Sequence, residues 1–154
     1  MVNILAYADD LVLLAPCWRA LLYSSCWINC TLQLVTLIMF CNSRKTVCMI
    51  FSPKCRSKTF AYQFPNFTIN NEQLSFVHEF KYLGHIISNN QLDDADIYRE
   101  RKNIFFRCNM LARRFYSCST AVKQRLFNSF CLCFYDVALW NNFTTRSLDK
   151  LRSA

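Results

Sequence analysis

Two adjacent carboxylates in the most apolar stretch of the N-terminal region strongly constrain how this chain can fold. Asp9 and Asp10 lie between residues 4–8 and 11–15, which carry no other charge. An aspartate pair is costly to bury because of desolvation and like-charge repulsion, unless a cation neutralises it. Both flanking runs are β-prone, and aspartate is a common turn residue. Residues 2–15 are therefore predicted to form a β-hairpin with the two carboxylates at its turn.

The aspartate pair has two interpretations. Two carboxylates at a tight turn can share divalent cations, and Mg²⁺ prefers carboxylate and phosphate oxygens. In a two-metal site one ion activates an attacking hydroxyl and the other holds the leaving pyrophosphate. Alternatively, Asp9 and Asp10 are ordinary residues of a surface turn. The residue types alone leave both interpretations open.

The rest of the chain predicts strands first and helices last, an α+β fold. A helix is expected after Pro16. Strands are expected over 46–51, 60–64, 67–69 and 80–87, the last carrying the single glycine, where a bulge or close backbone approach is typical. Apolar residues then recur at helical spacing from Ile97 to Phe115, after acidic residues suited to a first turn. A second helix is predicted from Thr120 to Leu139.

Composition bears on partners and location. The 154 residues suit one domain or the end of a larger one, and 18 Lys and Arg against 10 Asp and Glu favour polyanionic partners. The 10 cysteines form no C-x-x-C pair, which favours reduced, apolar filler residues and an intracellular location, nuclear or cytoplasmic. Residues 20–43 carry no charge and are long enough to span a bilayer, although polar residues dilute them. A small membrane-anchored protein is therefore one alternative.

Three motifs occur in the order typical of a polymerase palm. Tyr7-Ala8-Asp9-Asp10 resembles the Y-x-D-D box of reverse transcriptases. Residues 42–51, NSRKTVCMIF, resemble the N-x-x-K-[ST] stretch and its following strand, and residues 80–87, FKYLGHII, resemble the Y-L-G primer grip. Together they are most similar to the enzymes of non-LTR (LINE-type) retrotransposons. The resemblance implies the C-terminal part of a palm over residues 1–90 and a helical thumb over 91–154.

The resemblance also implies roles for individual residues, with two Mg²⁺ ions, an RNA template, a DNA primer and dNTP as cofactors and partners. Asp9 and Asp10 would be catalytic metal ligands, and Lys45 would lie near the nucleotide phosphates as a further catalytic group. The turn that holds the primer end would contain Tyr82, Leu83 and Gly84. The template–primer backbone would contact Arg99, Lys102, Arg107, Arg113 and Arg114. Alternatively, Lys45 is an ordinary solvated lysine, and Tyr82, Leu83 and Gly84 belong to a core strand. The basic residues from Arg99 to Arg114 would then form an ordinary solvated helix face.

The chain also departs from the family pattern. Reverse transcriptases need a third carboxylate on an upstream strand, but no acidic residue precedes Asp9 and the fingers are missing. We therefore expect little polymerase activity without the missing N-terminal polymerase half. Residues 23–40 are uncharged where the family has an amphipathic helix, and a local frameshift in a decaying element is our hypothesis for them. A non-catalytic nucleic-acid-binding remnant of such an element is a further alternative.

Overall fold

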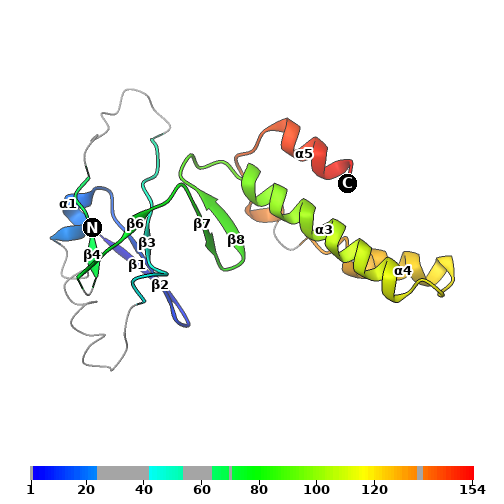
Figure 1. Ribbon diagram of the computed structural model, residues 1–154. Helices are drawn as coiled ribbons and strands as arrows, with labels where there is room; N and C mark the ends of the chain where they lie inside the picture. The colour runs from blue at the N-terminus through cyan, green and yellow to red at the C-terminus, as the bar shows by residue number, and fades with distance from the viewer. Residues whose placement is uncertain (1, 24–41, 54–63, 70, 135–136) are drawn as a thin grey trace. The chain divides into compact units, whose positions relative to one another are not determined.

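The computed structural model describes residues 2–23, 42–53, 64–69, 71–134 and 137–154 (Figure 1). These residues form a mixed α+β structure, which confirms the predicted fold class. They fall into two compact units, one of residues 1–48 and 55–77 and one of residues 49–54 and 78–154. This division assigns residues 79–88 to the same unit as the C-terminal helices, whereas the family resemblance groups them with the preceding strands. The segment of the frameshift hypothesis lies, from residue 24 on, outside the described residues.

The first unit begins with the predicted hairpin. Strand β1 (Asn3–Tyr7) pairs antiparallel with β2 (Asp10–Leu14), and Tyr7 lies opposite Asp10. The chain reverses through Ala8 and Asp9, and Ala8 has a φ of 52°. A positive φ in a two-residue connection matches the right-handed twist of the flanking strands. The prediction of a hairpin with aspartate at its turn is confirmed.

The other elements that the structure describes in the first unit are short. Helix α1 (Trp18–Leu22) starts at Cys17, whose side chain accepts a hydrogen bond from the Ala20 backbone N–H. Strand β3 (Val47–Cys48) pairs parallel with β6 (Ser75–Phe76), and β4 (Thr68–Ile69) pairs antiparallel with β5 (Glu72–Gln73). The strand predicted over 46–51 is thus only two residues long. The core contains Phe67, Ile69 and Leu74, packed against Trp18, Leu21, Leu22 and Cys48.

The second unit begins with a hairpin of β7 (Glu79–Tyr82) and β8 (His85–Ser88), in which Tyr82 lies opposite His85. The prediction of one continuous strand over 80–87 is wrong. The chain reverses at Leu83 and Gly84, whose φ angles are 46° and 90°. Glycine adopts this left-handed conformation at little cost, so the single glycine marks a turn rather than a bulge.

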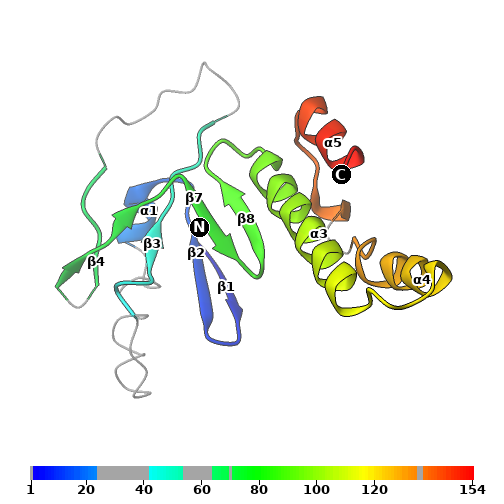
Figure 2. The ribbon, with the colours of Figure 1, turned by 45° about the vertical axis from the view of Figure 1, so that its right-hand side comes forward.

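Three α-helices follow the hairpin: α3 (Asp94–Arg114), α4 (Thr120–Phe130) and α5 (Thr145–Arg152), with a short 3₁₀ helix η1 (Val137–Leu139) before α5. Helix α3 contacts β8, α4 and α5 (Figure 2). It confirms the predicted first helix, and Ile97 and Ile104 are buried on its packed face. The second predicted helix is too long, because α4 ends at Phe130 and the fully buried Cys131 follows as its C-cap.

Candidate functional site

Asp9 and Asp10 lie at the turn of the β1–β2 hairpin. Asp9 belongs to the turn, Asp10 is the first residue of β2, and both are exposed. Hard oxygen ligands in this position fit one Mg²⁺ ion, which commonly binds one or two carboxylates and keeps several waters. Among the described residues, no group of three or more His, Cys, Asp or Glu side chains could hold a metal ion. At this turn the described part of the chain thus presents two exposed carboxylates and no third ligating side chain.

The apolar residues of this hairpin are exposed. Their exposed fractions range from 40 to 63% and include residues of both strands: Ile4, Leu5, Tyr7, Leu11 and Leu14. Exposed apolar residues scattered singly are normal, but a contiguous set is typical of a surface that packs against further protein.

Lys45 lies in a turn before β3 and is exposed. Asn42 organises this turn, because its carbonyl oxygen accepts from the backbone N–H groups of Lys45 (3.1 Å) and Thr46 (3.0 Å). The Asn42 side chain also accepts from the Lys45 N–H at 3.2 Å, and the Thr46 hydroxyl donates to the Asn42 carbonyl at 2.8 Å. The asparagine and threonine of the N-x-x-K-[ST] motif therefore shape the backbone around the lysine. Within the described residues, no hydrogen bond or ion pair joins Lys45 to Asp9 or Asp10.

The predicted primer-grip residues form the turn between β7 and β8. Tyr82 is half-buried, while Leu83 and Gly84 are exposed. The turn borders a cavity of about 470 Å³ within the second unit, whose lining includes Tyr82, Leu83, His85, Asp96, Leu139 and Trp140. The structure thus brings the three predicted residues together at one exposed turn.

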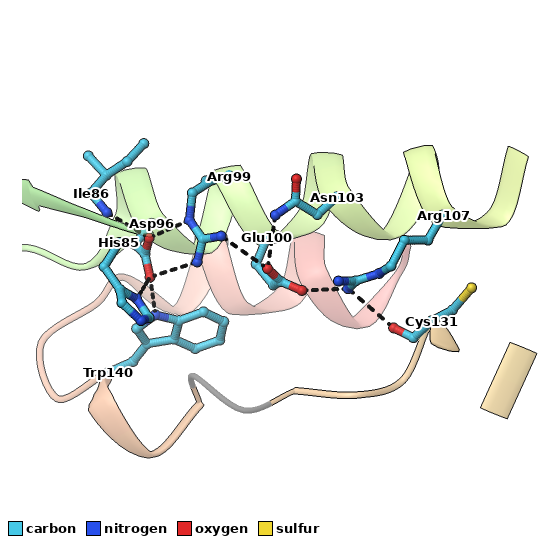
Figure 3. A network of polar contacts seen from close by, with 9 residues as sticks. All are labelled: His85, Ile86, Asp96, Arg99, Glu100, Asn103, Arg107, Cys131 and Trp140. Atoms are coloured by element: carbon cyan, nitrogen blue, oxygen red, sulfur yellow. Dashed lines mark hydrogen bonds and ion pairs between the residues drawn. The ribbon is translucent and has the colours of Figure 1, made fainter. Parts of the chain in front are cut away.

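Asp96 is the centre of a buried polar network that the sequence did not predict (Figure 3). Asp96 is only 3% exposed. It accepts hydrogen bonds from Arg99 Nε at 2.6 Å, the Ile86 backbone N–H at 2.9 Å and Trp140 Nε1 at 2.9 Å, and it lies 3.0 Å from His85 Nδ1. One carboxylate therefore connects β8, α3 and the segment after η1.

The environment of Asp96 acts on its pKa in two opposite directions. Burial raises the pKa, because desolvation disfavours the charged form. The hydrogen bonds from Arg99, Trp140, His85 and the Ile86 N–H stabilise the carboxylate and outweigh burial, so the pKa lies far below its ordinary value of 3.8. Asp96 is therefore ionised at neutral pH.

Glu100 extends the network along α3. It is 4% exposed and accepts from Arg107 Nη2 at 2.5 Å, Asn103 Nδ2 at 3.1 Å and Arg99 Nη1 at 3.4 Å. Arg107 also donates to the Cys131 carbonyl at 3.4 Å, which connects α3 to the end of α4. Two of the predicted nucleic-acid-binding arginines are thus engaged with buried carboxylates, and their side chains are only 18% (Arg99) and 27% (Arg107) exposed.

The other three predicted helix residues, Lys102, Arg113 and Arg114, are exposed. The Lys102 ammonium lies 4.4 Å from the centre of the Tyr98 ring, and the Arg101 guanidinium lies 5.4 Å from that of Phe105. The sequence analysis did not single out these aromatic residues. Each ring lies four residues from its cation, and this spacing was the available signal, because such positions are neighbours on a helix.

A second pair of adjacent aspartates, Asp93 and Asp94, begins α3 and provides an internal comparison with Asp9 and Asp10. Asp93 accepts from two backbone N–H groups, those of Asn141 and Asn142, each at 2.8 Å. Asp94 accepts from the Thr144 N–H at 2.9 Å and hydroxyl at 3.1 Å, and hydrogen bonds outweigh burial to lower its pKa. These carboxylates hold the start of α5 against α3.

The cysteines that the structure describes range from exposed (Cys17) to fully buried (Cys131). Six of them are free thiols: Cys17, Cys48, Cys108, Cys118, Cys131 and Cys133. Burial and the neighbouring Cys108 thiol raise the pKa of Cys131 to about 11. A thiol with such a pKa is protonated at neutral pH and therefore a poor nucleophile.

Comparisons with protein-family models, with curated proteins and with solved structures give no match. Within the described ranges, no helix is both long and apolar enough to cross a membrane. Residues 24–41, the larger part of the stretch behind the membrane-anchor alternative, lie outside these ranges. The family resemblance therefore depends on the three motifs alone.

Proposed function

We propose that this chain is the C-terminal palm and thumb portion of an RNA-directed DNA polymerase, a reverse transcriptase of the non-LTR type. The observation that carries the proposal is the position of Asp9 and Asp10, two exposed carboxylates at the tip of an antiparallel hairpin. The other two motifs support it, because each also falls at a turn: residues 42–46 before β3, and Leu83-Gly84 between β7 and β8.

The residues of this chain would contribute to nucleotidyl transfer by binding and by charge. Bound Mg²⁺ would activate the primer hydroxyl and stabilise the leaving pyrophosphate. Asp9 and Asp10 would hold an ion, since their carboxylates are exposed and belong to no ion pair within the described residues. Lys45, exposed on an ordered turn, would offset negative charge on the nucleotide phosphates.

We propose that the chain is inactive on its own. The family resemblance implies a third carboxylate on an upstream strand, and this chain supplies two. A site that lacks one ligand binds its ions more weakly and in poorer geometry, which costs orders of magnitude in rate. The exposed apolar residues of the hairpin support the same conclusion, because they would pack against further strands of a palm.

Metal binding at the hairpin tests the proposal directly. Paramagnetic Mn²⁺ serves as the probe, and NMR measures the broadening of each backbone amide signal. We expect selective broadening at residues 8–11, with loss of the effect in the Asp9→Asn/Asp10→Asn double variant. Asp93 and Asp94 provide the matched control, because their carboxylates already accept backbone hydrogen bonds. Equal broadening around both pairs, or broadening that survives the double substitution, would contradict a metal site at the hairpin.

A second candidate function is non-catalytic binding of nucleic acid. It is favoured by the exposed cations Lys102, Arg113 and Arg114 and by the excess of basic residues in the chain. Fluorescence anisotropy with an RNA–DNA hybrid at 50–200 mM salt measures it, and a steep fall of affinity with salt is expected. Absence of binding at the lowest salt concentration would exclude this function.

A further inference from the structure

One face of α3 carries aromatic and basic side chains that are exposed together. Positions 98, 102, 105, 109 and 113 are spaced by three or four residues, which places them on one side of a helix. The buried residues of α3, including Ile97, Glu100 and Ile104, lie on the opposite side. We call this set the aromatic–basic stripe; it consists of the half-buried Arg101 and of the exposed residues Tyr98, Lys102, Phe105, Phe106 and Arg113.

The rings of this stripe are unusually exposed for aromatic residues of a helix. The exposed fractions are 70% for Phe106, 53% for Tyr98 and 43% for Phe105. Clustered aromatic surface in water is unfavourable and marks a binding site more often than isolated exposed residues do. A group of exposed rings of this kind is typical of a surface that binds a partner with flat apolar groups.

The charge of the stripe identifies the class of partner. Between residues 98 and 114 the chain has one acidic residue, Glu100, and this carboxylate is buried and bound by Arg107 and Asn103. Between residues 98 and 114, the exposed face of α3 thus presents cations and no carboxylate. Two of the cations, Lys102 and Arg101, already lie against ring faces, at 4.4 and 5.4 Å from the ring centres. A nucleotide needs this juxtaposition, because its base stacks on a ring while its phosphate contacts a cation.

We propose that the aromatic–basic stripe binds single-stranded nucleic acid, with unpaired bases stacked on Tyr98, Phe105 and Phe106. This inference rests on the second candidate function and names its ligand. The phosphates of a duplex can contact the cations. Its bases cannot stack on the rings, because they are already stacked on one another. Single strands supply free base faces, and stacking on an aromatic side chain tolerates any base. From residue 98 to 113 the stripe rises about 22 Å along the helix axis, room for several nucleotides.

The experiment compares two RNA ligands with the full-length chain. Fluorescence anisotropy at several salt concentrations gives the dissociation constants for a labelled 12-nucleotide oligouridine and for a 12-base-pair RNA duplex. Three variants are measured: Tyr98→Ala/Phe106→Ala for the rings, Lys102→Gln/Arg113→Gln for the cations, and Tyr23→Ala as a control. Tyr23 is 82% exposed and belongs to the other compact unit. Circular dichroism verifies that each variant keeps its helix content.

The proposal makes a different prediction for each variant. Loss of two rings weakens oligouridine binding about 100-fold, roughly tenfold for each stacked base, and leaves the salt dependence unchanged. Loss of two cations reduces the slope of log affinity against log salt by about 1.4. Tyr23→Ala has no effect.

Three outcomes would overturn the inference. If the duplex binds as tightly as oligouridine and the ring variant binds both normally, the stripe contacts phosphates only, and non-catalytic nucleic-acid binding survives without its single-strand preference. If neither RNA binds at 50 mM salt, the binding function fails together with this inference. Sedimentation of the wild type and the ring variant tests whether the rings contact protein instead of RNA. If the ring variant loses self-association and keeps its RNA affinity, the rings belong to a protein interface.

Discussion

Replacement of Asp96 by asparagine tests the buried network of the second unit. Asparagine keeps the size of the side chain but removes its charge and puts an N–H₂ group where Asp96 accepts hydrogen bonds. In the wild type, Asp96 is 3% exposed. It accepts hydrogen bonds of 2.9 Å or less from Arg99 Nε, the Ile86 N–H and Trp140 Nε1. An amide oxygen and nitrogen cannot satisfy all of these donors, and Arg99 loses the carboxylate that neutralises it.

The magnitude follows from these contacts. Removal of one partner of a buried ion pair typically costs 3–5 kcal/mol. Arg99 keeps contact with water and with Glu100, so we expect the lower end, about 3 kcal/mol. With a urea dependence of about 2 kcal/mol per M, the unfolding midpoint should fall by about 1.5 M. The loss would be a large part of the 5–15 kcal/mol that is typical of a whole domain.

Urea unfolding followed by circular dichroism at 222 nm is the appropriate assay, because α3, α4 and α5 all belong to the second unit. Asp149→Asn is the matched control. Asp149 also faces an arginine, Arg152, but at 3.8 Å and with both side chains about 70% exposed. Exposed ion pairs contribute little to stability, so the urea midpoint of Asp149→Asn should differ from that of the wild type by less than about 0.3 M. Equal effects of the two substitutions would show that the Asp96 network contributes no special stability.

Two further predictions concern acid stability and the β7–β8 turn. Because hydrogen bonds lower the pKa of Asp96 in the folded state, its stabilising contribution is complete above the ordinary pKa of 3.8 and is lost as the pH falls below it. The urea midpoint of the wild type should therefore fall more steeply from pH 5 to 2.5 than that of Asp96→Asn; equal slopes would refute this. Gly84→Ala should cost about 1 kcal/mol from backbone strain alone, since φ is +90° and no atom lies within 4 Å of an added Cβ. Gly84→Asn should cost less, because asparagine tolerates this conformation, and an equal cost would contradict the strain argument.

The sequence predicted the elements whose signals are local. The β1–β2 hairpin was predictable because two apolar strands flank a turn residue, and register follows from the tight connection. The first long helix was predictable because its apolar period persists over five turns and acidic residues begin it. The candidate metal ligands, Asp9 and Asp10, were visible for the same reason.

Other features gave no clear local signal. Residues 80–87 contain apolar residues on both sides of Gly84, so they suggest one strand as readily as two short ones, and only the left-handed turn at Leu83 and Gly84 distinguishes them. No glycine or proline lies between Phe130 and Leu139, so the helical pattern has no stop. Helix α4 nevertheless ends where Cys131 becomes fully buried and its carbonyl accepts from Arg107.

By itself, then, the sequence determined the class of fold, the hairpin that carries the two aspartates and the long helix with its basic residues, because hydrophobic period and turn chemistry act over a few neighbouring residues. Only the tertiary structure decided which charges of that helix face water. Packing of Trp140 and β8 against α3 buries Asp96, and burial of a carboxylate requires donors, so Arg99 turns inward. Lys102 and Arg113 bind no buried carboxylate and stay exposed, Lys102 against the Tyr98 ring.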